Sequence, residues 1–279
     1  MILLDGKKLS SEIVKELKQE LTKSNNLPGL GIVLVGNRSD SLKYVTSKEK
    51  ICSEIGIHFN LIHLEETCEE DDLIEIIKEL NNNKSIHGII VQLPLPKQLN
   101  SDKILDTISP EKDVDGFHQK NAGKLFLNRN KSFVPCTPLG CVELIQYYGI
   151  DVKGLNICIV GCSNVVGLPL SMMLLQRNAT VTLCHEHTKD LKKHTIDADM
   201  IFSCCGVPKI ITKDMVKKDV IIIDIGINFV DGKLVGDIDF EGVKDKCKYI
   251  TPVPGGVGPM TIAMLMKQTI IAWKRINKL

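Results

Sequence analysis

The feature that most constrains the fold of this chain is the alternation of short apolar runs with segments of helical periodicity. Apolar runs at 30–35, 57–64 and 88–93 each have the length of a buried strand. The segments over 39–55 and 73–80, which separate them, carry apolar residues at helical spacing. Strands that are joined through helices pair in parallel, and the helices cover the sheet. The sequence therefore predicts an α/β fold.

A second series of the same kind occupies the latter half of the chain. Further strands are predicted at 156–160, 180–184, 200–203 and 220–224. A last helix is predicted over 259–276, where apolar residues recur at helical spacing. Between the two series, residues 113–135 are polar and rich in loop-forming residues. We therefore expect two α/β domains with their junction in this stretch.

Composition argues against several kinds of partner. The 279 residues include 35 Lys and Arg against 34 Asp and Glu, a formal net charge of +1, so no basic surplus points to nucleic acid or an anionic membrane. The most apolar stretch, 220–227, is too short to span a bilayer and is interrupted by Asp224 and Gly226. The first residues lack the order of charged and apolar residues typical of a signal peptide. We expect a cytoplasmic protein with no nucleic-acid or membrane partner.

The cysteines and histidines indicate no metal site. The chain has 10 cysteines, several of them within apolar runs, and no set at the spacing of a zinc finger. His185 and His187 lie two residues apart and would share a face on a strand, but no third ligand is evident. We expect buried thiols in a reducing compartment and no bound metal.

A glycine-containing turn after the strand at 156–160 is a candidate for cofactor binding. Gly161, Cys162 and Ser163 follow the strand, and Gly167 lies where the next helix opens. Glycine lets the backbone approach a pyrophosphate, and a helix N-terminus offers free N–H groups. The pattern is G-x-S-x-x-x-G instead of G-x-G-x-x-G, so an ordinary tight turn explains it about as well.

The end of the following strand strengthens the cofactor interpretation. His185 and Glu186 come directly after the strand at 180–184, where a Rossmann domain places the group that meets the adenine ribose. A solvated loop after a strand is an equally good interpretation of Glu186 and of His187, which follows it.

Several polar residues of the first series are candidates for chemistry. Tyr44 and Lys48 are four apart on a predicted helix and share a face, although spacing alone favours an exposed pair. Gln92 lies at the carboxyl end of a predicted parallel strand, where ligands bind in such sheets. Asp113 and Asp115 precede Gly116, and turn chemistry is the alternative explanation for both.

Five segments together resemble the tetrahydrofolate dehydrogenase/cyclohydrolase family. They are Ser-Leu-Lys-Tyr-Val-Thr-Ser-Lys at 41–48, Gly-Ile-Ile-Val-Gln-Leu-Pro-Leu-Pro at 88–96, Lys-Asp-Val-Asp-Gly-Phe at 112–117, Pro-Cys-Thr-Pro-Leu-Gly at 135–140 and Thr-Pro-Val-Pro-Gly-Gly-Val-Gly-Pro-Met-Thr at 251–261. The similarity is colinear over nearly the whole chain. The Gln-Leu-Pro-Leu-Pro and Pro-Gly-Gly-Val-Gly-Pro runs are its most specific parts.

The resemblance implies an arrangement of domains and an assembly. A folate-binding catalytic domain is expected over 1–118, completed by a C-terminal helix at 260–279 that returns to it. A Rossmann-like dinucleotide-binding domain is expected over 137–259. Members of the family work as homodimers that associate through their Rossmann-like domains.

The resemblance also implies two activities and the residues that carry them. The enzyme would oxidise methylenetetrahydrofolate to methenyltetrahydrofolate and hydrolyse that product to formyltetrahydrofolate. The expected catalytic residues are Lys48, Tyr44, Gln92 and Asp115. Folate would be held by Tyr44, Gln92, Asp115, Pro254, Gly255 and Gly256. The cofactor would be held by Gly161, Cys162, Ser163, Val166, Gly167, His185, Glu186 and Ile227.

The choice of cofactor is where this chain departs from the resemblance. Many members use NADP and carry a basic residue after the first glycine of the turn or after the histidine of the next strand end, whereas this chain has Cys162 and Glu186 there. A carboxylate would repel a 2′-phosphate and accept from a 2′-hydroxyl. We expect NADP as the working cofactor, with measurable NAD activity.

Three other functions compete with the bifunctional enzyme. A monofunctional NAD-dependent methylenetetrahydrofolate dehydrogenase is disfavoured because Tyr44, Lys48 and Gln92 are all present. An unrelated two-domain dehydrogenase would leave the first series of strands and helices unexplained. A non-catalytic nucleotide-binding protein would be expected to lose these polar residues.

Overall fold

The computed structural model describes all residues except 25 and 130–131. The described chain divides into two compact units. The six-stranded unit comprises Met1–Ser11 and Thr137–Thr261, and the three-stranded unit comprises Glu12–Cys136 and Ile262–Leu279. The C-terminal segment therefore returns to the first series, as expected. Residues 1–11, which we expected in the folate-binding domain, group with the six-stranded unit because β1 (Ile2–Leu3) pairs with β11 (Cys247–Ile250).

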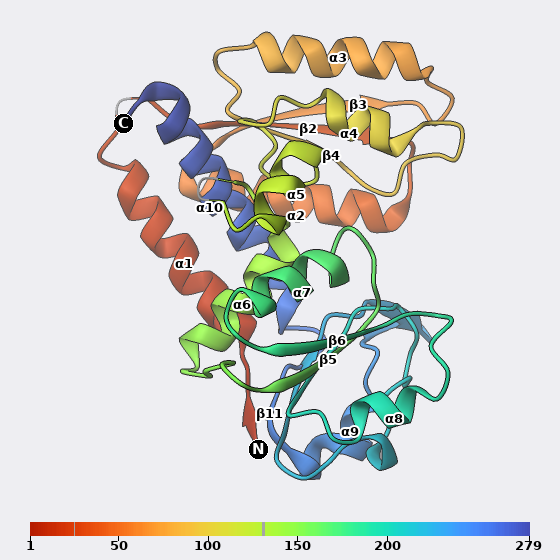
Figure 1. Cartoon of the computed structure of the whole chain (residues 1–279). Coiled ribbons are helices and arrows are strands. Elements are labelled where there is room, and N and C mark those ends of the chain that lie inside the picture. The colour runs from red at the N-terminus through yellow and green to blue at the C-terminus, as the bar shows by residue number, and fades with distance from the viewer. Residues whose placement is uncertain (25, 130–131) are drawn as a thin grey trace. The chain divides into compact units, whose positions relative to one another are not determined.

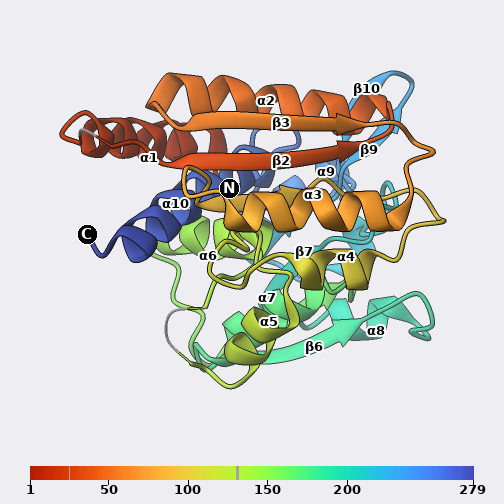
Figure 2. The ribbon, with the colours of Figure 1, turned by 90° about the horizontal axis from the view of Figure 1, so that it is seen from above.

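The three-stranded unit is a small parallel sheet covered by helices. Its strands have the order β3-β2-β4, with bounds Gly29–Val35 for β2, His58–Leu64 for β3 and Gly88–Val91 for β4. Figure 2 shows β2 and β3 side by side and running in the same direction. The helices are α2 (Ser39–Ile55), α3 (Glu70–Asn82), α4 (Ser101–Thr107) and α5 (Gln119–Phe126), with most of α1 (Gly6–Leu21) and α10 (Val257–Asn277).

Strand β2 is buried on both faces, which explains its unbroken apolar sequence. Helices α2 and α3 lie on opposite faces of the sheet (Figure 1). Val33 and Val35 of β2 pack with Leu73 and Ile77 of α3 in one buried cluster. The predicted strand 88–93 ends at Val91, so Gln92 is the first residue beyond β4, and its N–H still donates to the carbonyl of Val33 at 2.8 Å. The side chain of Gln92 is thereby held at the carboxyl edge of the sheet.

The six-stranded unit has an all-parallel main sheet in the order β1-β11-β8-β7-β5-β6. Four of its strands have the predicted bounds: Asn156–Val160 (β5), Thr180–Cys184 (β6), Met200–Ser203 (β7) and Val220–Asp224 (β8). Its other elements are α6 (Cys136–Tyr147), α7 (Gly167–Leu175), α8 (Leu191–Thr195), α9 (Phe240–Val243), the hairpin of β9 (Asn228–Val230) and β10 (Lys233–Val235), and short 3-10 turns at Lys213–Met215 and Lys244–Lys246.

The strand order of this sheet contains a reversal that locates a binding crevice. From β5 the chain proceeds to β6 on one side, and then to β7, β8 and β11 on the other side. In parallel α/β sheets, ligands bind outside the carboxyl ends of the strands where the order reverses. The crevice of this sheet is therefore expected beyond Val160 of β5 and Ser203 of β7.

Of the helices in the described part of the chain, none is long and apolar enough to cross a membrane.

Candidate active site

Lys48 is buried on the face of α2 that turns toward the core. The buried residues of this helix are Ser41, Val45, Lys48, Cys52 and Ile55, which follow one another at intervals of three or four. The interpretation of Lys48 as half of an exposed pair is therefore wrong, since its side chain belongs to the apolar stripe. Tyr44, one turn before it, is half-buried, and this burial raises the pKa of its phenol.

The ammonium of Lys48 has a polar partner from another element. Its Nζ donates to Oε1 of Gln92 at 2.9 Å, and Nε2 of Gln92 donates to the carbonyl of Leu93 at 2.8 Å. Because the amide is engaged at both ends, its oxygen is held toward the lysine. The structure thus brings together two of the predicted catalytic residues, one from α2 and one from the end of β4.

Burial and charge act on Lys48 in opposite directions. Burial lowers the pKa of Lys48, and the nearby carboxyl of Asp115 and the thiols of Cys136 and Cys52 partly oppose this shift. The pKa of Asp115 is raised by burial and lowered by Lys48. Lys48 in this environment is therefore easier to deprotonate than a lysine in water.

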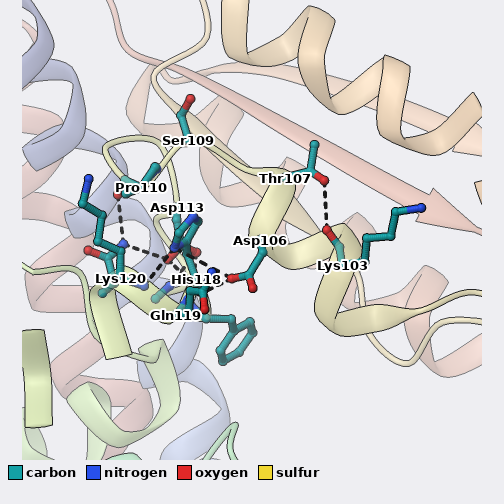
Figure 3. A network of polar contacts seen from close by, with 12 residues as sticks. Lys103, Asp106, Thr107, Ser109, Pro110, Asp113, His118, Gln119 and Lys120 are labelled. Atoms are coloured by element: carbon teal, nitrogen blue, oxygen red, sulfur yellow. Dashed lines mark hydrogen bonds and ion pairs between the residues drawn. The ribbon is translucent and has the colours of Figure 1, made fainter. Parts of the chain in front are cut away.

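Asp113 and Asp115 have different roles in the structure. Asp113 is almost fully buried, and its carboxylate accepts from the N–H groups of Gly116, Phe117 and His118 at 3.0, 3.1 and 2.9 Å. It also accepts from Nδ2 of Asn121 at 2.8 Å. Figure 3 shows Asp113 inside this network. Turn chemistry therefore explains Asp113, and the turn that it stabilises follows Asp115 directly.

Gln268 is a polar residue of this region that the sequence analysis missed. It lies on α10 and is buried; its Nε2 donates to the carbonyls of Val114 at 2.6 Å and Val134 at 2.9 Å. Its Oε1 accepts from the N–H of Val134 at 3.2 Å. These bonds fix the backbone beside Asp115 and Cys136. The signal in the sequence was its helical spacing from Met264, Leu265 and Ala272, which places the amide on the apolar face of α10.

The predicted phosphate-binding turn lies between β5 and α7 in the six-stranded unit. Gly161 has φ +114°, and a Cβ there would lie 2.6 Å from the carbonyl oxygen of Cys204. A Cβ on Gly167 would lie 1.9 Å from the carbonyl oxygen of Gly161. The hydroxyl of Ser163 accepts from the N–H of Val166 at 3.2 Å. The turn thus folds tightly at the N-terminus of α7, in the expected crevice, and its shape requires both glycines.

The residues after β6 are exposed. The N–H of His185 donates to the hydroxyl of Thr188 at 2.9 Å, and Nδ1 of His185 accepts from the N–H of His187 at 3.1 Å. Oε1 of Glu186 lies 3.5 Å from Nε2 of His187, with both side chains more than four-fifths exposed. Glu186 is therefore an exposed carboxylate at the carboxyl end of β6.

The remaining predicted residues belong to two turns of the six-stranded unit. Ile227 is exposed and follows β8. Pro254, Gly255 and Gly256 precede α10, and the carbonyl of Gly255 accepts from the N–H of Lys7 at 2.9 Å. Tyr44, Lys48, Gln92 and Asp115 belong to the three-stranded unit. In the described part of the chain, no cluster of three or more metal-binding side chains is present.

Comparison with known proteins gives matches over nearly the whole chain. Residues 4–115 match "Tetrahydrofolate dehydrogenase/cyclohydrolase, catalytic domain", and residues 135–277 match "Tetrahydrofolate dehydrogenase/cyclohydrolase, NAD(P)-binding domain". The bifunctional protein FolD of Nitratiruptor is 52% identical over 99% of both chains. The crystal structure of the bifunctional FolD of Campylobacter jejuni is 48% identical, with a TM-score of 0.97 over 100% of both chains.

A third relative was solved with its cofactor. The methylenetetrahydrofolate dehydrogenase-cyclohydrolase of Trypanosoma brucei, complexed with NADP and an inhibitor, is 33% identical, with a TM-score of 0.96 over 100% of this chain and 99% of that one. Together with the arrangement of Lys48, Gln92 and the turn at Gly161, these matches show that the chain belongs to the tetrahydrofolate dehydrogenase/cyclohydrolase family.

Proposed function

We propose that the buried Lys48, paired with the half-buried Gln92, performs the proton transfers of the cyclohydrolase reaction, and that the six-stranded unit binds the cofactor of the dehydrogenase reaction. The two activities follow from the family and from the bifunctional relatives. The chain is a methylenetetrahydrofolate dehydrogenase and a methenyltetrahydrofolate cyclohydrolase. This confirms the bifunctional prediction over the monofunctional alternative. The residues and the cofactor are our proposal.

The 2.9 Å bond between Lys48 Nζ and Gln92 Oε1 is the observation that carries this proposal. In ring opening of the methenyl cation, the attacking water becomes the formyl oxygen and loses both its protons; one ends on the ring nitrogen whose bond to carbon breaks, and the other is released. A lysine whose pKa is lowered by burial gives up its proton more readily than a lysine in water, so Lys48 can act as a base and return the proton as an acid. Gln92 orients the amine, and Asp115 would hold the amino edge of the pterin, because a carboxylate accepts paired N–H bonds. Tyr44 would pack on the folate, and the loop of Pro254, Gly255 and Gly256 would close over it.

The dehydrogenase reaction asks less of the side chains. NADP, when bound, accepts a hydride from the methylene carbon of the folate, so the protein mainly positions the two reactants. The tight turn from Gly161 to Gly167 suits a pyrophosphate, since its glycines let the backbone approach closely and the turn opens onto the N-terminus of α7. We propose that Cys162, Ser163 and Val166 line this turn against the phosphates. His185 and Glu186 would meet the adenine ribose, and Ile227 the other end of the cofactor.

The pH dependence of the cyclohydrolase tests the role of the Lys48–Gln92 pair. If neutral Lys48 is the base, the rate rises with pH through its lowered pKa and then levels off. Gln92→Glu should move this rise to higher pH by about one unit or more, because a carboxylate stabilises the ammonium. Gln92→Leu should move it to lower pH, because the ammonium loses its acceptor. Initial rates of methenyltetrahydrofolate hydrolysis, corrected for the uncatalysed reaction, measure both shifts. Equal profiles for the two variants would contradict the proposal.

We propose NADP as the working cofactor with measurable NAD activity, and Glu186 as the residue that weakens the preference for NADP. The exposed carboxylate at the end of β6 would repel a 2′-phosphate. In Glu186→Ser, the ratio of kcat/KM for NADP to kcat/KM for NAD should rise several-fold. A change of this size is on the order of one surface charge interaction. Lys189→Ser changes an exposed charge of the same loop in the opposite sense and serves as the matched comparison. A cofactor ratio that is unchanged in Glu186→Ser would leave Glu186 an ordinary solvated residue.

We further propose that the enzyme is a cytoplasmic homodimer that associates through its six-stranded units, and that the three-stranded unit with the C-terminal helix binds folate. The family habit supports these statements. Light scattering of the purified protein should give twice the mass of the chain, and a monomer at assay concentrations would contradict the assembly.

A further inference from the structure

A buried carboxylate joins two turns at the carboxyl edge of the six-stranded sheet. Asp237 is completely buried. Its Oδ2 accepts from the hydroxyl of Ser203 at 3.0 Å and from the N–H groups of Cys205 and Gly206 at 2.9 and 3.2 Å. Its Oδ1 accepts from Nδ2 of Asn228 at 3.0 Å. Asp237 therefore connects the end of β7 with the turn after β8.

A second buried carboxylate holds Asp237 in place. Asp224, the last residue of β8, accepts from the N–H groups of Asp237 and Ile238 at 2.9 and 3.1 Å. It also accepts from the N–H of Gly226 at 3.1 Å. Burial raises the pKa of Asp224 to about 6 against these donors. Two carboxylates thus take backbone and side-chain donors from three neighbouring segments.

Two glycines make room for the carboxylates. A Cβ on Gly236 would lie 1.8 Å from Oδ2 of Asp224, and a Cβ on Gly226 would lie 2.0 Å from Oδ1 of Asp237. A side chain at either position would displace the carboxylate that lies against it. The network is closely packed, and removing its central carboxylate leaves several donors without their acceptor.

The turns that this network holds lie where one half of the cofactor would bind. The strand order places β6, β5, β7 and β8 side by side. With the adenine ribose at the end of β6 and the pyrophosphate at the end of β5, the nicotinamide half extends beyond β7 and β8. Ile227 is exposed there, between Gly226 and Asn228, which bond to Asp224 and Asp237.

We propose that Asp237 is a positioning residue for the nicotinamide half of the cofactor. It acts through the backbone of Cys205 and Gly206 and through Asn228, and it does not touch the reacting atoms. This inference rests on the proposed placement of the cofactor at the carboxyl ends of the strands. It predicts an effect on hydride transfer without an effect on the adenine half or on the cyclohydrolase, whose catalytic residues belong to the three-stranded unit.

Asp237→Asn is the direct test, because an amide keeps the shape but turns an N–H₂ group toward one set of donors. For this variant, kcat/KM of the dehydrogenase for NADP should fall about tenfold or more. The inhibition constant of 2′,5′-ADP, which contains only the adenine half, should stay within about twofold, as should the cyclohydrolase rate. Asp231→Asn makes the same change in charge at the exposed turn of the β9–β10 hairpin and should alter none of these quantities.

Three results would overturn the inference. The first is an unchanged dehydrogenase kcat/KM in Asp237→Asn, and the second is a loss of 2′,5′-ADP binding that parallels the loss of dehydrogenase activity. The third is a parallel loss of the cyclohydrolase. If Asp237→Asn does not fold, Asn228→Ala removes one bond to Asp237 and leaves the buried carboxylate its other donors. It should lower the dehydrogenase kcat/KM in the same selective way, and an unchanged value would again refute the inference.

Gly161→Ala separates this inference from the proposed cofactor site. The substitution puts a Cβ at φ +114° and against the carbonyl of Cys204. It should weaken NADP and 2′,5′-ADP together. Normal binding of both to Gly161→Ala would contradict the proposed cofactor site. If Gly161→Ala bound both ligands more weakly while Asp237→Asn kept the wild-type dehydrogenase activity, only the role of Asp237 would be contradicted.

Discussion

Lys48→Met should abolish the cyclohydrolase and leave the dehydrogenase measurable. Methionine keeps an unbranched side chain in the apolar stripe of α2 but carries no proton. Only the hydrolytic reaction needs a proton carrier at this position, since the dehydrogenase depends on the positions of folate and cofactor. Loss of a general acid–base group typically lowers a rate by about 10²–10⁴-fold. The assay follows hydrolysis of methenyltetrahydrofolate and, separately, reduction of NADP with methylenetetrahydrofolate.

Lys50→Met is the matched control for this experiment. Lys50 lies on the same helix two residues later and is exposed. Its replacement removes the same charge from the same element and should leave both activities near the wild-type values. If Lys48→Met hydrolysed methenyltetrahydrofolate at the wild-type rate, Lys48 would not be the residue that carries the proton. Equal losses of both activities would show that it serves binding instead.

Asp115→Asn should depress both activities together and weaken the binding of folate. The proposed carboxylate–pterin contact orients a substrate that the two reactions share, so its loss acts before either chemical step. Two charge-assisted hydrogen bonds are at stake, and we expect kcat/KM of both reactions to fall about a hundredfold. Binding of folate is measured directly by titration of the free enzyme.

Asp102→Asn provides the comparison. Asp102 is exposed on α4, and its substitution should leave both activities and the affinity for folate unchanged. The neighbour Asp113 is unsuitable as a control because its carboxylate holds the turn that follows Asp115. A loss confined to one activity, with normal affinity for folate, would exclude the role of Asp115 as the pterin anchor.

The sequence predicts much of the fold because its apolar runs have clear limits. Strands β5, β6, β7 and β8 and helix α2 have the bounds that periodicity predicts. In β5, β7 and β8 the apolar run coincides with the buried stretch, whereas β6 is largely exposed or half-buried and α2 is buried on one face only. Strand β4 is shorter than the run 88–93, because Leu93 lies outside the ladder although it is apolar.

The catalytic residues could not be derived from spacing alone. A lysine at the edge of an apolar stripe is usually exposed, and nothing near Lys48 in the sequence shows that its partner Gln92 lies on a different element. Asp113 and Asp115 are chemically alike in sequence, and only tertiary contacts separate the residue that holds the turn from the residue that faces Lys48. The resemblance to a family provided what the local pattern could not.

Other contacts of the site left little trace in the sequence. Gln268 reaches the backbone of Val114 and Val134 from a helix more than a hundred residues away. Asp237 follows a short hairpin and would be read as a turn residue, yet it is completely buried and accepts from two neighbouring turns. Such long-range polar networks depend on the folded arrangement and not on local propensity.

The most direct test of a bifunctional enzyme is a single reaction mixture of the purified chain, methylenetetrahydrofolate and NADP. Reduced cofactor and the methenyl absorbance are followed together, and formyltetrahydrofolate is measured at the end. Our account predicts that reduced cofactor and formyltetrahydrofolate form in equal amounts, with only transient methenyltetrahydrofolate in the wild type and its accumulation in Lys48→Met. If methenyltetrahydrofolate accumulated in the wild-type mixture and then disappeared no faster than by uncatalysed hydrolysis, the bifunctional activity would be contradicted.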